Sequence, residues 1–355
     1  MKCSVCKTEI SDHSTTCPIC EFNNVQKTFV NLDDAQNWEK NELLPFRIQW
    51  EKQNSIDSTL LRVKERIETL VNEFPNDILE ILIKSTGTTI LNMAKMIIGT
   101  VSNELNVPLD DGTKYYDKAL SYSYVALLHR LQNAVRHPEN LKESMLNLLD
   151  TKFWYFDFKF LYIDCPPAQL MWGNYDSGIV VFAYIDYSAG ITFDVLADAH
   201  ISGDNTITIS RRDKTTAKKI RFESFKNIGN AKVIDLCQTD FNISIFADAV
   251  AHHDIYYKDL HPDIANLRMN RDLDSSRYPA NPDDIQVWFV YNGKIEENPW
   301  VRYSHTDQNN GFIYGTLLNE PRMNYGVHQG DTIPFRTLEI ENGRVVCVFT
   351  TDYFN

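Results

Sequence analysis

The 355-residue sequence contains 14 glycines but none of the glycine motifs that mark common enzyme classes. It has no G-x-x-x-x-G-K-[ST] phosphate loop, no G-x-G-x-x-G dinucleotide fingerprint and no G-x-S-x-G nucleophile elbow. The zinc-protease motif H-E-x-x-H is also missing. These absences argue against P-loop NTPases, dinucleotide-dependent enzymes, typical α/β-hydrolases and zincin proteases.

Basic charge and long apolar runs are both scarce. The sequence has 35 Lys and Arg against 48 Asp and Glu, a formal net charge of −13, which disfavours broad binding to nucleic acid or an anionic membrane but leaves room for a local basic site. The most apolar stretch, residues 78–101, is interrupted by Glu80, Lys84 and Lys95. A membrane-spanning helix needs about 20 mostly apolar residues. We therefore expect two buried helices there, with membrane association as the less favoured alternative.

Four of the seven cysteines lie in the first twenty residues, as Cys3-x2-Cys6 and Cys17-x2-Cys20. Each pair presents two thiolates to one metal ion, and two pairs supply the four ligands of a tetrahedral Zn²⁺ site. Such a site has no open coordination position, so its ion is structural. The spacing predicts a zinc ribbon over residues 1–24, in which iron could replace zinc.

The segment around the second pair, Cys17-Pro18-Ile19-Cys20, resembles the short zinc ribbons at the start of many bacterial proteins. Disulfide pairing of these cysteines is the alternative interpretation. Against it, no basic start followed by an apolar run, as in a secretory signal, opens the sequence. The remaining cysteines (Cys165, Cys237 and Cys347) are scattered among apolar neighbours, which suits buried free thiols in a reducing compartment. We therefore expect a cytoplasmic protein.

Residues 33–150 are predicted to form a helical domain. Apolar residues recur at alternating steps of four and three, which places them on one stripe of a helix. They are Ile56, Leu60, Val63, Ile67, Leu70 and Phe74. A helix packed inside a bundle is favoured over an intermolecular zipper. Further helices are expected over residues 114–137 and 140–149, because prolines punctuate the pattern between them.

Residues 153–275 are predicted to form a mainly antiparallel β domain. Short runs rich in β-branched and aromatic residues lie at 178–184, 206–210 and 231–236, and turn residues separate them. The pattern becomes partly helical after residue 246. Residues 275–283 are rich in Ser, Pro, Asn and Asp and have the composition of a linker.

Residues 283–355 contain strand candidates at 286–291, 300–305, 311–318 and 345–350, which predict a small β-barrel-like module. The turn Gly315-x-Leu317-x-Asn319-x-Pro321 and the pair Gly330-Asp331 resemble a small bacterial domain family of unknown function. That resemblance implies no catalytic residues. The predicted fold class is therefore an α+β multidomain protein with a zinc ribbon, a helical bundle, an antiparallel β domain and this module.

A basic cluster between two predicted strands forms the first candidate binding site. It comprises Arg211, Arg212, Lys214, Lys218, Lys219 and Arg221. Cations at a hairpin tip can project together toward phosphate groups. The favoured alternative is a solvated turn whose charges protect the sheet edge from aggregation.

A second candidate site is the segment 252–263, which contains three His and three Asp. These side chains can ligate metal ions or transfer protons, although surface and helix-capping roles are favoured. If the segment is helical, His252 and Tyr256 share a face and His253 points elsewhere. The polar residues Glu320, Arg322 and Asp331 form a third candidate group, for which a role in turn geometry is favoured.

Two functions are compatible with these features. The first is a cytosolic bacterial binding or adaptor protein with a protein partner, in stress response or in conflict with phage or toxins. The second is a nucleic-acid-processing enzyme that uses the 252–263 cluster with the 211–221 hairpin. The two differ in whether these two segments converge on one site. The sequence identifies neither the partner nor the oligomeric state.

Overall fold

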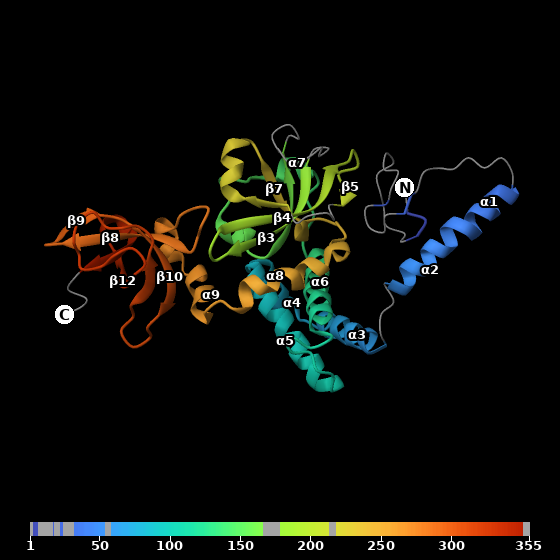
Figure 1. Ribbon diagram of the computed structural model, residues 1–355, viewed down its shortest axis with the longest axis horizontal. Coiled ribbons are helices and arrows are strands. Elements are labelled where there is room, and N and C mark those ends of the chain that lie inside the picture. The colour runs from blue at the N-terminus through green and yellow to red at the C-terminus, as the bar shows by residue number, and fades with distance from the viewer. Residues whose placement is uncertain are drawn as a thin grey trace.

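The computed structural model describes residues 3–5, 17, 22–23, 32–53, 58–165, 178–212 and 218–350. An N-terminal helical rod, a central sheet with helices against one face and a C-terminal barrel follow one another in Figure 1. The structure therefore contains both helices and antiparallel sheet, as the sequence predicts for an α+β protein. None of the described helices combines the length and apolarity that a membrane crossing requires.

The rod is continuous through α1 (Leu32–Trp38), the π-helical turn η1 (Glu39–Leu43) and α2 (Leu44–Gln53). Pro45, the second residue of α2, does not end this helix. Proline lacks an N–H and its ring crowds the carbonyl four residues earlier. The wider π turn just before it, in which Leu44 N–H donates to the Glu39 carbonyl, accommodates the ring without ending the helix.

The central helices end and begin where local chemistry provides caps. Val63, Ile67 and Val71 are buried, which confirms that α3 packs through an apolar stripe. The Thr86 side chain caps α5 by accepting from Thr89 N–H, and Asn106 ends that helix in the left-handed conformation, at φ 51°. The helices of this part are α3 (Ser58–Asn72), α4 (Asn76–Ile83), α5 (Gly87–Leu105), α6 (Tyr116–Ala134) and α7 (Leu141–Ser144).

The helix expected over residues 140–149 is mostly absent. After the single turn of α7, the chain forms β1 (Leu146–Asn147), which pairs antiparallel with β7 (Lys232–Asp235). Pairing with the sheet edge thus prevails over the local helical pattern.

The seven-stranded sheet is antiparallel in all its pairings, with the order β1-β7-β2-β3-β4-β5 and β6 beside β5 on β4. Its remaining strands are β2 (Lys159–Asp164), β3 (Gly178–Asp186), β4 (Gly190–Ile201), β5 (Ile207–Arg212) and β6 (Lys219–Arg221). Residues of β3 alternate between two hydrophobic clusters, one on each face: Phe182 and Tyr184 lie in the first, Val181 and Ala183 in the second. Both faces of the sheet are therefore covered.

The helices and the sheet share one hydrophobic core. Val63 of α3 and Leu120 of α6 belong to the same buried cluster as Phe160 and Phe182 of the sheet. The predicted division between residues 150 and 153 thus falls between segments that pack against each other. Gly87 helps to bring α5 close to the sheet, because a Cβ there would lie 2.0 Å from the Asp157 carbonyl oxygen.

Two helices lead from the sheet to the C-terminal barrel, α8 (Asp248–Lys258) and α9 (Pro262–Met269). Five strands close the barrel in the order β8-β10-β11-β12-β13, and the parallel pairing of β13 with β8 completes the ring. The barrel strands are β8 (Asp284–Tyr291), β10 (Trp300–Thr306), β11 (Ile313–Leu317), β12 (Thr332–Glu339) and β13 (Val345–Thr350), with β9 (Lys294–Glu297) as an outer hairpin arm. Ile264 and Leu267 of α9 pack into the barrel core.

The segment 275–283, expected to be a linker, is instead packed between the sheet and the barrel. The Arg277 guanidinium is buried and donates to the Pro282 carbonyl (2.7 Å) and to the Tyr303 hydroxyl (2.9 Å). The Ala280 carbonyl accepts from Ile191 N–H of β4 at 2.8 Å. Proline and small polar residues, typical of linkers, here form a turn that holds the barrel against the sheet.

Candidate metal centre

A buried carboxylate in the sheet faces helix α8. Asp194 of β4 pairs with Phe182 on one side and with Lys219 of β6 on the other. Directly paired residues project from the same face of a sheet. Phe182 belongs to the cluster under the helices, so Asp194 and Lys219 occupy the helix-facing side. Asp194 is 3% exposed.

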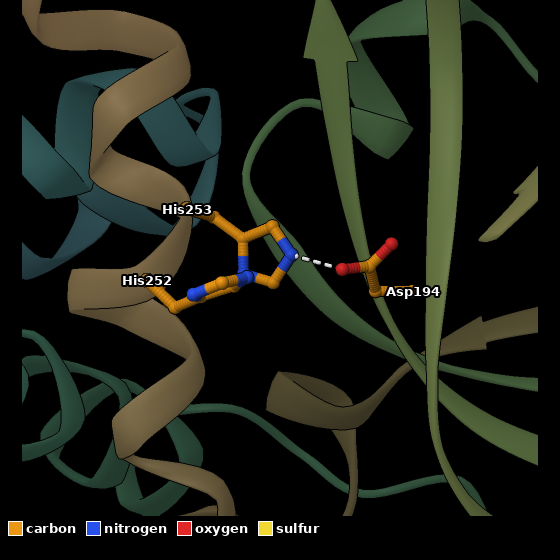
Figure 2. A group of neighbouring side chains, drawn as sticks. All are labelled: Asp194, His252 and His253. Atoms are coloured by element: carbon orange, nitrogen blue, oxygen red, sulfur yellow. Dashed lines mark hydrogen bonds and ion pairs between the residues drawn. The ribbon is translucent and has the colours of Figure 1, made fainter. Parts of the chain in front are cut away.

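His253 of α8 reaches this carboxylate (Figure 2). Its Nε2 lies 2.6 Å from Asp194 Oδ2, and its Nδ1 lies 2.7 Å from the Ala249 carbonyl oxygen. A carbonyl oxygen can only accept, so Nδ1 carries a proton and Nε2 is the nitrogen directed at Asp194. The ring is 1% exposed and stacks on Phe182 with centroids 4.7 Å apart. Helix and sheet thus fix the tautomer and orientation of His253.

His252 completes a group of three possible ligands. Its ring centroid is 4.8 Å from that of His253, and the potential ligand atoms of Asp194, His252 and His253 all lie within 4.8 Å of one another. His252 is exposed, whereas the other two residues are buried. Two imidazoles and one carboxylate are a ligand set that Zn²⁺ and related ions accept, and three protein ligands leave a position for water or substrate.

The second oxygen of Asp194 supports this assignment. Oδ1 is buried and forms no hydrogen bond with any described residue. A buried carboxylate oxygen without a partner is rare, and an ion or ordered water is its usual explanation. The Nδ1–H of His253, held by a backbone carbonyl, is also the outer contact that metal-bound histidines commonly make. The residues present therefore fit a bound cation.

Cationic and aromatic side chains adjoin the group. The Lys219 ammonium lies 2.7 Å from the Tyr256 hydroxyl and 5.1 Å from the centre of that ring. Tyr256 stacks on Tyr184 with centroids 4.5 Å apart. Burial and the nearby carboxylate of Asp194 raise the pKa of Tyr184, so its phenol stays protonated at neutral pH. The exposed side of the centre thus presents the Lys219 ammonium and the Tyr256 phenol, whereas Tyr184 is buried beneath them.

The structure joins part of the predicted basic cluster to the predicted His/Asp segment. Lys219 and Arg221 lie two residues apart on β6 and so project from the same face of the sheet. The Arg221 guanidinium lies 3.7 Å from Asp186 Oδ2. Arg211 and Arg212 are placed through their backbone, in β5, opposite β4. Lys218 precedes β6, and Lys214 lies outside the described residues. The hairpin and α8 therefore meet at Lys219 and Tyr256.

The surface roles favoured for the 252–263 segment are correct only in part. His253 and Asp254 are buried, and Asp254 accepts from the Tyr116 hydroxyl and pairs with Lys95 at 2.7 Å. His261, by contrast, caps α9, in agreement with the helix-capping role that was favoured for this segment. The expectation that His253 points away from the His252 face overlooked that one ligand atom from each ring can still converge on Asp194.

Sequence reasoning missed Asp194 as a functional candidate. Its signal is an ionisable residue inside the apolar strand sequence Ile191-Thr192-Phe193-Asp194-Val195, where burial of an unpaired charge is costly. That signal identifies a site, but the strand alone does not reveal the partner, because His253 follows 59 residues later.

Two of the four predicted zinc ligands can be placed. Cys3 and Cys17 are buried in a small cluster with Phe22, and the Val5 N–H donates to Cys3 Sγ at 3.4 Å. Trp38 of the helical rod packs against this cluster. Cys6 and Cys20 lie outside the described residues, so the zinc ribbon stays a prediction.

The scattered cysteines are free thiols, as predicted. Burial raises the pKa of Cys165 to about 12 and that of Cys347 to about 11, and it also raises the pKa of Cys237. Because the thiolate is the reactive form, these three side chains are unreactive at neutral pH.

The third candidate group fastens a barrel turn, which agrees with the favoured interpretation. Glu320 accepts from Gln329 N–H at 2.8 Å and contacts His328 Nδ1 at 2.8 Å, while Asp331 accepts from His328 N–H at 2.7 Å. Gly330 has φ 95°, a conformation that favours glycine. Arg322, the third member of the group, donates its backbone N–H to the Glu297 carboxylate of β9 at 3.1 Å, so the group fastens the turn to itself and to that strand.

Comparisons with known proteins identify no similar protein. No protein-family model, curated protein or solved structure matches this chain. Its function is therefore inferred from the site.

Proposed function

We propose that this chain is a metal-dependent nucleic-acid-processing enzyme. Asp194, His252 and His253 would hold a divalent metal ion, and Lys219 with the rest of the basic hairpin would bind the phosphate backbone. One observation carries the proposal: Lys219 of the hairpin lies 2.7 Å from Tyr256, which is one helical turn from His252. Two segments that the sequence indicates separately thus adjoin one surface.

Each residue has a definite task in this proposal. His253 donates Nδ1–H to Ala249 and so directs Nε2 at the ion site. One proton must lie between Nε2 and Asp194 Oδ2 for their 2.6 Å contact to be a hydrogen bond, and an ion bound there would displace it. When bound, such an ion polarises a phosphoryl oxygen and lowers the pKa of a coordinated water. Lys219 would hold phosphate oxygens by charge-assisted hydrogen bonds.

The predicted adaptor role is the alternative, and the four-cysteine ribbon supports it. A ribbon with four thiolates would hold a structural Zn²⁺ at Cys3, Cys6, Cys17 and Cys20 and offer a surface to a protein partner. This role requires no turnover at the Asp194 centre. Cytosolic location is common to both proposals.

The test measures cleavage and binding of labelled single- and double-stranded DNA and RNA with Mg²⁺, Mn²⁺ or Zn²⁺. His252→Ala removes an exposed ligand, so we expect a folded protein that binds nucleic acid but cleaves it at least ~100-fold more slowly. Lys219→Glu should weaken binding and reduce its salt dependence. Lys294→Glu, an equal charge change on exposed β9, serves as the matched control and should have little effect.

Three results would discriminate between the proposals. Cleavage that survives His252→Ala at the wild-type rate would contradict the metal-dependent mechanism. Equal binding losses in Lys219→Glu and Lys294→Glu would show that overall charge, not this surface, governs affinity. Binding without cleavage under any metal condition would favour the adaptor.

A further inference from the structure

We propose that a cavity between α3, α6 and the turn before α8 binds a small molecule that carries a phosphate or carboxylate group. We name it the α3–α6 cavity. Its volume is about 470 Å³, within the range of about 300–1,000 Å³ typical of small-molecule sites. It is distinct from the Asp194 centre, because none of the three possible metal ligands lines it.

Arg130 is the residue that points to an anion. It lines the cavity from α6, and its Nε is buried without a hydrogen-bond partner among the described residues. No carboxylate in that part of the chain forms an ion pair with it. A guanidinium is always charged and presents planar N–H donors that match phosphate and carboxylate oxygens. A partly buried guanidinium without a partner is therefore ready for an anionic ligand.

The other charges of the cavity do not neutralise Arg130. Lys64 and Glu68 of α3 pair with each other, with Nζ 3.8 Å from Oε1. Burial lowers the pKa of His129, although the Glu68 carboxylate opposes this shift, so the imidazole is mainly neutral at pH 7. The lining as a whole thus carries one positive charge in excess, at Arg130.

The other residues that line the cavity indicate the chemical character of the rest of the ligand. Val71, Val125 and Ala126 give the cavity apolar surface, and Tyr122 adds an aromatic ring. Ala247, which immediately precedes α8, also lines the cavity and provides no side-chain cap for that helix. Asp248 already supplies a negative charge in the first turn of α8, so the attraction for an anion comes from Arg130. The cavity therefore suits an oxyanion attached to an apolar or planar body.

The test uses calorimetric titration of the full chain in the His252→Ala/Lys219→Glu background, so that neither the metal centre nor the proposed phosphate contact at Lys219 contributes to binding. The probes are inorganic phosphate, adenosine 5′-monophosphate and citrate, with adenosine as the uncharged control. We expect saturable binding of at least one anion and none of adenosine. Phosphate-bearing probes that bind without citrate would identify a phosphate ligand, and the reverse would identify a carboxylate ligand.

Arg130→Met removes the guanidinium but keeps an apolar side chain of similar length. We expect it to weaken anion binding at least ~10-fold, whereas Arg62→Met, at an exposed position of α3, should leave binding unchanged. The melting temperature of the ligand-free Arg130→Met protein should stay equal or rise, because an unpaired charge is removed. A lower melting temperature would identify Arg130 as a structural residue and overturn the proposal. Anion binding that is absent, or unaffected by Arg130→Met, would overturn it as well.

Discussion

Asp283→Asn is expected to lower the free energy of unfolding by about 3–5 kcal/mol. Asp283 forms a two-pronged ion pair with Arg268 of α9, at 2.9 Å from Nε and 2.6 Å from an Nη atom, and it also accepts from the Tyr303 hydroxyl. Arg268 is 5% exposed. Losing the carboxylate charge leaves the buried guanidinium with only the Asp157 carboxylate, 3.9 Å from an Nη atom, as a counterion. Breaking a buried pair in this way costs far more than the loss of a surface pair.

Chemical denaturation followed by circular dichroism measures this change. The control is Glu139→Gln, which breaks the pair of Glu139 with Arg136 at a site where both side chains are more than four-fifths exposed. Surface pairs contribute about 0–1 kcal/mol, so the control should scarcely shift the transition. Similar shifts in both variants would contradict the stabilising role of the buried Asp283–Arg268 pair.

Cys17→Ser is expected to remove one zinc ion per chain and to unfold the N-terminal cluster. Structural zinc in comparable small modules binds with an apparent free energy of about 10–16 kcal/mol, far more than a cluster of four buried side chains can provide. Trp38 packs on this cluster, so its fluorescence should change. The helices from α3 onward should stay folded, so most of the helical circular dichroism signal should be retained.

Metal analysis of the reduced full chain gives the comparison. Cys237→Ser is the matched control, because that thiol is remote from the ribbon in sequence and is predicted to bind no metal. An unchanged zinc content in Cys17→Ser would rule out the four-cysteine site. A loss of zinc in both variants would point instead to general instability.

The elements of this fold were largely predictable, but their partners were not. Alternation along β3 and the Val63–Ile67 stripe of α3 each identify an apolar face. Neither pattern shows which other element its apolar face packs against. The sequence therefore predicted a helical domain and a β domain as separate units, although the helices and the sheet share one core. The same limit applies to residues 275–283, where turn-forming composition suggested a linker and Arg277 instead anchors the segment by contacts with residues distant in sequence.

Only part of the candidate site was predictable from the sequence. The His/Asp segment and the basic hairpin are visible as local clusters, but their meeting depends on the pairing of β6 with β4 and on the docking of α8. Asp194 shows no cluster at all, because its neighbours along the strand are apolar or neutral. Sites of this kind are assembled by tertiary contacts, so they cannot be predicted from the spacing of residues along the sequence.

The most direct test of the metal centre is an anomalous difference map from crystals of the full chain grown with Zn²⁺. We expect a peak about 2.0–2.2 Å from an Asp194 oxygen and from one ring nitrogen each of His252 and His253. We also expect Nε2 of His253 to have separated from Asp194 Oδ2, which lies 2.6 Å away without the ion. A zinc peak at the ribbon cysteines would serve as the internal control. A map with that peak but none among Asp194, His252 and His253 would contradict the proposed metal centre.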